Sequence, residues 1–152
     1  MTRIDFYFNA PDKLGTAVQL ARKAYAKKNH LLIYTRDSAQ LDAIDRLLWT
    51  APPTGFVPHC RAGHKLAAQT AILLTSDAAA LDSAAMPHHE VMINLDDEHP
   101  AQFSRFERLL EIVSRDDADD RLRARARLKF YRDRGYQTGT VDLATLKDKA
   151  AS

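Results

Sequence analysis

The chain has 152 residues, of which 45% are hydrophobic and 28% charged, and its formal net charge is +2. This composition is typical of one soluble globular domain and excludes a disordered chain. With Cys60 as its one cysteine, the chain can form neither an internal disulfide framework nor a four-cysteine zinc site. The first residues do not resemble a secretory signal, and no apolar run approaches the ~18 residues of a membrane helix. We therefore expect a cytoplasmic protein that does not contact a membrane.

The first third of the chain alternates between strand and helix patterns. Residues 4–8 are β-branched and aromatic, and they end at an Asn-Ala-Pro turn. Apolar residues at helical spacing then predict a helix over 12–28, followed by a buried strand over 31–35. Asp37 or Ser38 can cap a second helix, whose inner face carries Leu41, Ile44 and Leu48.

Beyond this helix, three prolines and a glycine interrupt regular structure between residues 50 and 58. Residues 56–59 read as extended chain or a short edge strand, because a central strand tolerates proline poorly. Several further elements follow, namely strands over 71–75 and 91–95, a short helix over 77–85, an amphipathic segment over 103–113 spaced for one helical face, and a last long helix over 119–134 that ends at Gly135.

This alternation predicts an α/β fold in which a mostly parallel sheet has helices on both faces. We expect a single domain over residues 1–144 and a polar tail over 145–152. The turn at residues 9–15 lacks both the dinucleotide glycine fingerprint and the phosphate loop. The prediction is a Rossmann-like domain without a nucleotide site and without a cofactor.

Residues with metal-binding or catalytic chemistry do not assemble into a convincing site. Four histidines lie near Cys60, so a metal ion is conceivable, but histidines on surface loops explain them as well (His59, His64, His88, His89). Residues 96–98 are three carboxylates that could bind a cation or form a solvated loop. There is no nucleophile elbow. We therefore expect no metal site and no catalytic residues.

A first candidate binding segment surrounds the single tryptophan. Trp49 is followed by a proline-rich loop and then by Phe56, Pro58 and His59. A loop stiffened by prolines can present aromatic side chains as interface anchors. The equally good alternative is that Trp49 and Phe56 fill the core.

A second candidate lies in residues 121–135, where seven of the fifteen residues are basic and one is acidic. On a helix, one side carries Arg121, Arg125, Lys129 and Arg132, and another carries Arg123, Arg127 and Arg134. Arginine suits carboxylates and phosphates alike. The basic side can therefore bind an acidic partner, bind single-stranded nucleic acid directly, or remain a solvated face neutralised by four upstream aspartates (Asp116, Asp117, Asp119, Asp120).

Three motifs together resemble the chi subunit of bacterial DNA polymerase III. They are Asp5-Phe6-Tyr7-Phe8 near the start, Leu48-Trp49 followed by Pro52 and residues 56–59, and the arginine-rich helix ending in Tyr131-Arg132-x-x-Gly135-Tyr136. The resemblance covers nearly the whole chain. It implies a Rossmann-like fold without a nucleotide site and a non-catalytic role as an accessory subunit of a replicative polymerase.

The resemblance also implies partners. Chi subunits pair with the psi subunit of the clamp loader and bind the acidic C-terminal tail of the single-stranded-DNA-binding protein, so that DNA is contacted indirectly. By this resemblance, psi or a helicase at the same surface would bind Trp49, Phe56, Pro58 and His59. The acidic tail would bind six residues, with Leu128 and Thr140 forming a notch for its aromatic end (Arg121, Arg125, Leu128, Lys129, Arg132, Thr140). The family has an aromatic residue at the position of Leu128, so the notch is expected to differ in shape.

Overall fold

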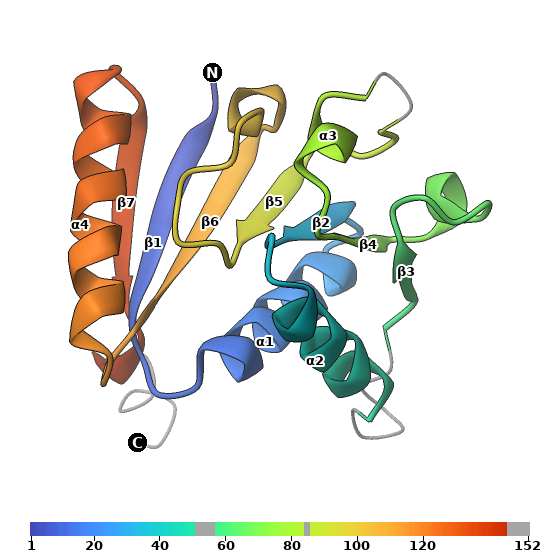
Figure 1. The fold of residues 1–152 in the computed structure, drawn as a ribbon, viewed down its shortest axis with the longest axis horizontal. Coiled ribbons are helices and arrows are strands. Elements are labelled where there is room, and N and C mark those ends of the chain that lie inside the picture. Colours follow the sequence, from blue (N-terminus) through green and yellow to red (C-terminus); the bar gives the residue numbers. More distant parts are fainter. Residues whose placement is uncertain (51–56, 84–85, 146–152) are drawn as a thin grey trace.

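Within the described residues, seven parallel strands form one sheet in the order β3-β4-β2-β5-β6-β1-β7 (Figure 1). The structure is a computed structural model, and it describes residues 1–50, 57–83 and 86–145. The strands are β1 (Arg3–Ala10), β2 (Leu31–Tyr34), β3 (His59–Arg61), β4 (Ile72–Thr75), β5 (Val91–Asn94), β6 (Arg108–Ser114) and β7 (Gln137–Asp142). The helices are α1 (Lys13–Ala26), α2 (Ser38–Trp49), α3 (Ala78–Leu81) and α4 (Ala118–Asp133), with 3-10 turns η2 (Ala67–Gln69) and η3 (Phe103–Arg105).

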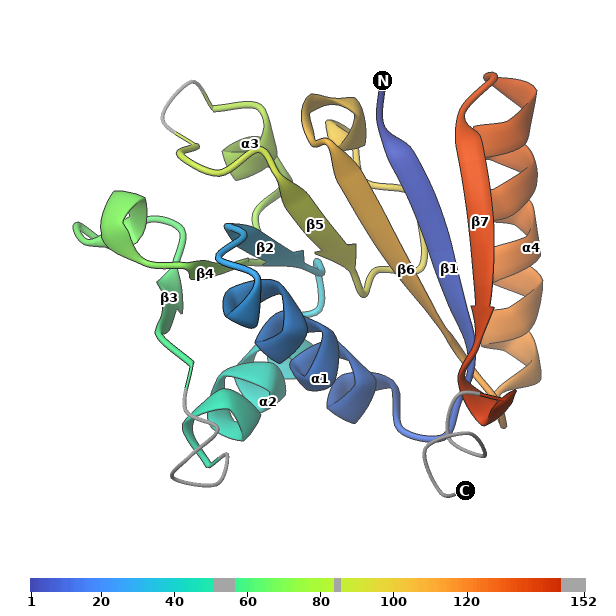
Figure 2. The same cartoon turned by 180° about the vertical axis from the view of Figure 1, so that it is seen from behind.

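Helices cover both faces of the sheet, which confirms the predicted α/β architecture. On one face, α1 and α2 lie side by side and pack on the apolar side chains of the central strands (Figure 2). On the other face, α3 and α4 pack on a second apolar cluster that includes Phe6, Leu109 and Tyr131. Strand β1 lies between β6 and β7, so the two ends of the chain are adjacent in the sheet.

The prediction of an amphipathic helix over 103–113 is wrong. Residues 108–114 form strand β6, which pairs with β5 on one side and β1 on the other. Leu109 and Val113 belong to the cluster under α4, whereas Leu110 and Ile112 belong to the cluster under α1. A strand buried on both faces is apolar at nearly every position, so a helical spacing arises in it by coincidence.

Strand β7 was not predicted, because its sequence has little hydrophobic alternation. It is a partly exposed strand at the end of the sheet and pairs with β1 alone among the described strands. The remaining elements lie where they were predicted, with ends shifted by a few residues. The proposed tail over 145–152 falls mostly outside the described residues.

Helices α1 and α4 end in the same hydrogen-bonded cap but with different residues at its left-handed position. In α4, Gly135 has a φ of 83°, and the N–H of Tyr136 donates to the carbonyl of Tyr131. In α1, Lys28 takes the equivalent position with a φ of 62°, and the N–H of Asn29 donates to the carbonyl of Ala24. Glycine is the usual residue at this position because it has no Cβ to strain.

Candidate functional site

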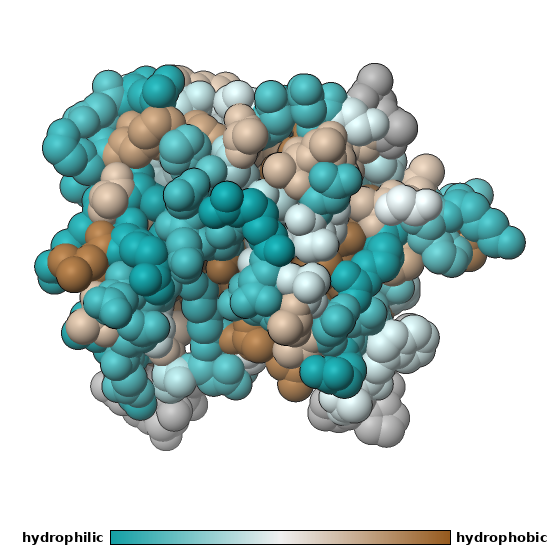
Figure 3. All heavy atoms as spheres, viewed as in Figure 1, coloured by the Kyte–Doolittle hydropathy of each residue, from teal (hydrophilic) through white to brown (hydrophobic). Residues whose placement is uncertain are grey.

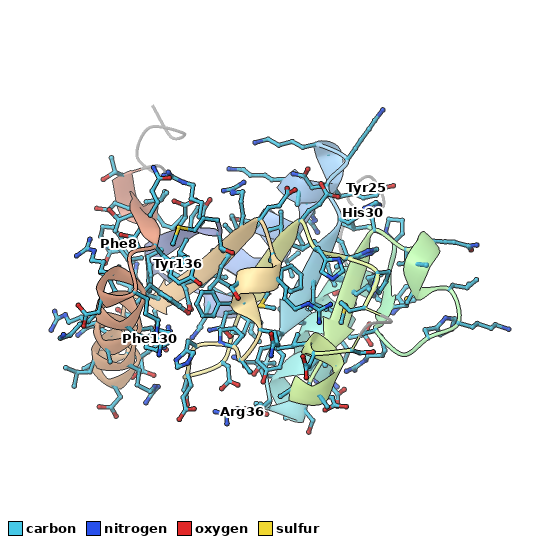
Figure 4. The ribbon with its side chains drawn as sticks, turned by 90° about the horizontal axis from the view of Figure 1, so that it is seen from above. Phe8, Tyr25, His30, Arg36, Phe130 and Tyr136 are labelled. Carbon is cyan, nitrogen blue, oxygen red and sulfur yellow. The ribbon has the colours of Figure 1, made fainter. Side chains whose placement is uncertain are left out.

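A hollow of about 200 Å³ lies between α4 and strands β1, β6 and β7. Its lining is mostly apolar, with two arginines and a threonine as the polar members (Phe6, Phe8, Val113, Ala124, Leu128, Arg121, Arg125, Thr140). Figure 4 shows Phe8 close to α4 at one end of the molecule. We call this hollow the α4 pocket.

The α4 pocket is formed by side chains that recur at the spacing of a strand on one wall and of a helix on the other. On β1, Phe6 and Phe8 point to the same face because side chains alternate along a strand. Thr140 is the register partner of Phe6 on β7 and joins it on that face. Along α4, Arg121, Arg125 and Leu128 recur at helical spacing and line the opposite wall. The chain thus places cationic groups beside an apolar floor.

Arg125 is exposed and makes no hydrogen bond or ion pair within the described residues. Three of the four upstream aspartates that could have neutralised it have other partners, and the first of them, Asp116, pairs with Arg115. Asp117 caps α4 by accepting from the N–H groups of Asp119 and Asp120, and the Asp120 carboxylate lies 3.0 Å from the Lys13 ammonium. The charge of Arg125 is therefore available to a ligand. Arg121 also lines the pocket while donating to the carbonyl of Arg115.

Two of the six residues predicted for the acidic tail do not line this pocket. Lys129 lies 2.6 Å from the Asp133 carboxylate, one turn further along α4. Arg132 donates to the hydroxyl of Thr138 at 3.2 Å. The structure therefore gathers four of the predicted residues in one pocket and leaves two beyond it.

A buried polar network holds α4 on the sheet. The Glu111 carboxylate of β6 is fully buried and accepts from Tyr131 Oη at 2.6 Å and from Arg127 Nε at 3.2 Å. Asn94 Nδ2 donates to it at 3.1 Å. Burial raises the pKa of Glu111, against the lowering effect of Arg127. Because Arg127 and Tyr131 both belong to α4, this network fixes the helix that carries the pocket arginines.

The second predicted surface centres on Trp49, which is 63% exposed and therefore does not fill the core. Its ring contacts the edge of His59, with centroids 5.0 Å apart. The His59 side chain is only 1% exposed, and its two ring nitrogens lie 3.0 Å from Asp45 Oδ1 and 2.8 Å from the Val57 carbonyl. His59 thus supports Trp49 from beneath. Pro58 is partly buried beside it, and Phe56 lies outside the described residues.

The carboxyl edge of the sheet, where Rossmann-like folds bind nucleotides, is lined by carboxylates. A hollow of about 290 Å³ there is lined by five aspartates against one lysine and one arginine (Asp37, Asp96, Asp97, Asp117, Asp120, Lys13, Arg123). Asp37 and Asp117 cap the helix N-termini that could otherwise bind phosphate. This lining disfavours an anionic nucleotide.

Over residues 1–50, 57–83 and 86–145, no three His, Cys, Asp or Glu side chains are arranged to hold a metal ion. His88 is buried and contacts the carbonyl of Thr70 at 2.6 Å. In the carboxylate run, Asp96 pairs with Arg36 and Asp97 with Arg123. Within the same residues, no helix is long and apolar enough to cross a membrane.

Residues 1–139 match the model of the family described as "DNA polymerase III chi subunit, HolC". The chain belongs to the chi family of DNA polymerase III subunits. It is 31% identical over 140 residues to the DNA polymerase III subunit chi of Pseudomonas aeruginosa, covering 90% of this chain and 93% of that protein. It is 30% identical over 127 residues to the Haemophilus influenzae subunit of the same name, covering 84% and 85%. The resemblance inferred from the sequence motifs is thereby confirmed.

Membership of the chi family makes this chain an accessory protein of DNA replication. Among the residues of the sequence motifs, the structure distinguishes those that maintain the fold from those that are exposed. Tyr131 is fully buried and Gly135 forms the helix cap, so both maintain α4. Arg125 and Trp49 are exposed and can contact partners. Sequence reasoning did not assign Phe6, Phe8 and Val113 to the pocket, although the alternation of Ile4, Phe6 and Phe8 on one side of β1 was a usable signal.

Proposed function

We propose that this chi-family chain is a non-catalytic adaptor that binds the acidic C-terminal tail of the single-stranded-DNA-binding protein in the α4 pocket. The observation that carries the proposal is the combination of an apolar floor, formed by Phe6, Phe8 and Leu128, with the unpaired Arg125 above it. The family resemblance implies a tail that ends in aspartates and an aromatic residue with a free carboxylate. Such a peptide needs an apolar notch beside cationic groups.

The chemistry of the pocket fits the tail in a definite orientation. The terminal aromatic ring would enter the space between Phe8 and Leu128, where it would bury apolar surface. Its carboxylate would meet the guanidinium of Arg125, which suits a bidentate contact. Arg121, at the same wall of α4, would face the preceding aspartates. Lys129 and Arg132 would act through longer-range attraction, since their side chains have other partners.

We further propose that the surface around Trp49 binds a second protein, either psi or a helicase that uses the same surface. Two exposed apolar residues, Trp49 and Leu47, support this proposal. A large aromatic ring braced by His59 and Asp45 is the kind of preorganised anchor that dominates interface energies. Because Trp49 and the α4 pocket belong to different elements, the chain could hold both partners together.

The tail proposal is tested by titrating the protein with a fluorescent peptide that carries the acidic tail sequence and a free C-terminus. Three control peptides lack the final aromatic residue, carry a C-terminal amide, or have the aspartates replaced by asparagines. We expect saturable binding of the full peptide and at least about tenfold weaker binding of each control. Arg125→Ala should weaken binding of the full peptide without changing the unfolding temperature.

Two outcomes would contradict the tail proposal. Equal binding of all four peptides would mean that neither the notch nor the carboxylate contact exists. Absence of peptide binding, together with binding of bare single-stranded DNA that Arg125→Ala abolishes, would favour direct nucleic-acid binding by α4.

A further inference from the structure

The C-terminal part of α1 carries a concentration of positive charge that the proposed function does not use. Between Asp12 and Asp37 the sequence contains six lysines and arginines and no acidic residue. Four of these cations fall within residues 22–28, around the half-exposed ring of Tyr25 (Arg22, Lys23, Lys27, Lys28). We call these four cations and Tyr25 the α1 patch.

The cations of the α1 patch are not neutralised by the rest of the described chain. None of the four forms an ion pair with a described carboxylate, and the Nε of Arg22 is buried without a hydrogen-bond partner among the described residues. Glu90 pairs with His30, two residues beyond the patch. On α4, by contrast, Arg123, Arg127 and Lys129 all have carboxylate partners.

A hollow of about 420 Å³ adjoins the patch and presents aromatic surface. It is lined by Tyr25, Ala26, Lys28, Asn29, His30 and Ala71. Figure 4 shows Tyr25 and His30 beside each other and well apart from Phe8. The His30 ring is stacked on His88 at 4.6 Å, which holds it in place. An aromatic ring exposed among lysines is the arrangement that single-stranded nucleic acids require, since bases stack while phosphates pair with cations.

The backbone at Lys28 takes the left-handed conformation that favours glycine. The same helix cap is made by Gly135 at the end of α4, where no Cβ is strained. Lys28 adopts a φ of 62° in the equivalent position, held by the hydrogen bonds of the cap. A glycine at position 28 would therefore remove the ammonium charge and relieve the backbone strain at once.

We infer that the α1 patch binds the phosphate backbone of single-stranded DNA, with Tyr25 as a stacking surface for a base. The inference does not depend on the α4 pocket, because α1 covers the other face of the sheet. Four cationic contacts predict sequence-independent and salt-dependent binding, with a Kd of roughly 1–100 µM at moderate salt. The chain would then contact template directly through α1 while its partner proteins bind elsewhere.

The experiment measures the fluorescence anisotropy of a labelled oligothymidylate with the full chain between about 20 and 200 mM salt, a range over which the Debye length falls roughly threefold. The test variant is Lys27→Gln with Lys28→Gly, which removes two charges and relaxes the strained position. The matched control is Arg46→Gln with Lys65→Gln. It removes two exposed charges that lie outside α1 and form no ion pair among the described residues. Both variants carry the same net charge, so only the position of the lost charge differs.

For four phosphate contacts, the logarithm of the affinity should fall with the logarithm of salt at a slope of about −2.8, and the test variant should reduce this magnitude by about 1.4. The control variant should retain the wild-type slope. Tyr25→Ala should weaken binding roughly tenfold, whereas Tyr25→Phe should preserve it. Thermal unfolding of the test variant should be unchanged or shifted upward, because glycine suits the left-handed position.

Three results would overturn the inference. Absence of saturable DNA binding by the wild type at the lowest salt would exclude a DNA site. Equal losses in the test and control variants would attribute binding to net charge alone. Stronger binding of an acidic peptide than of DNA, lost in the test variant, would assign the patch to an acidic protein instead.

Discussion

Removing Arg127 tests whether the buried network, rather than the charge of α4, maintains the helix that forms the pocket. Arg127 is 4% exposed and Glu111 is fully buried, so Arg127→Met leaves a carboxylate without its ionic partner in the interior. Breaking a buried pair in this way costs about 3–5 kcal/mol. Because Glu111 keeps the hydrogen bonds from Tyr131 and Asn94, we expect the lower end, about 3 kcal/mol.

The matched control is Arg123→Met, one turn earlier on the same helix. Its ion pair with Asp97 has side chains that are 40% and 60% exposed, and such pairs contribute at most about 1 kcal/mol. Its second contact, with Asp120, is long at 3.9 Å, and Asp120 keeps its closer partner Lys13 at 3.0 Å. The free energy of unfolding is measured by urea denaturation monitored by circular dichroism. Similar losses in the two variants, or a loss below about 1 kcal/mol for Arg127→Met, would refute the reasoning.

The pH dependence and a second substitution sharpen the same experiment. Burial raises the pKa of Glu111, and loss of Arg127 raises it further, so the folded variant retains a proton that the unfolded chain releases. The deficit of Arg127→Met relative to the wild type should therefore shrink as the pH falls through the pKa of Glu111 in the folded variant, and it should level off once Glu111 is protonated in the folded wild type as well. Adding Glu111→Gln should recover about 1–2 kcal/mol at pH 7, because no buried charge remains unpaired.

Three other substitutions have expected outcomes. The Ser114 N–H and the Lys13 ammonium hold the pKa of Asp120 below its ordinary value, although burial opposes this. In urea denaturation, Asp120→Asn should therefore reduce the free energy of unfolding by about 1–3 kcal/mol at pH 7, and by progressively less below about pH 4. Trp49→Ala should lower the affinity for a partner at the Trp49 surface, measured by calorimetry, while reducing the free energy of unfolding by less than about 1 kcal/mol. For the buried Leu48, substitution by alanine should cost about 2–5 kcal/mol, and a similar cost for Trp49→Ala would show that Trp49 serves the core. Gly135→Ala should destabilise by about 1–2 kcal/mol because of its φ of 83°, and an unchanged unfolding temperature would show that the cap tolerates a Cβ.

The helices of this protein could be predicted because their signals are local. Asp37 caps α2, as the sequence indicated, and accepts hydrogen bonds from the N–H groups of Ala39 and Gln40. Helical spacing assigned Arg121 and Arg125 to one face of α4, and the family resemblance added Leu128. The same reasoning could not separate the buried Arg127 from the partly exposed Arg123, because the difference depends on Glu111 of a distant strand.

The strand half of the pocket was beyond sequence reasoning for a related reason. Phe6 and Val113 meet only because β1 pairs with β6, more than 100 residues away along the chain. Strand β7 was missed because its polar residues at the end of the sheet give little hydrophobic pattern. The surface over α4 is largely hydrophilic, with some apolar side chains among the polar ones (Figure 3).

The insertion of β1 between β6 and β7 has a consequence for how the chain is made. During synthesis the first strand leaves the ribosome long before its two neighbours, so it must wait without a partner while more than 100 residues are added. We therefore expect the closure of so large a loop to be a slow and late step of folding. The pocket walls come from β1, β6, α4 and β7, so the pocket can exist only after that closure. A nascent or truncated chain would lack it, and only finished molecules could compete for ligand there.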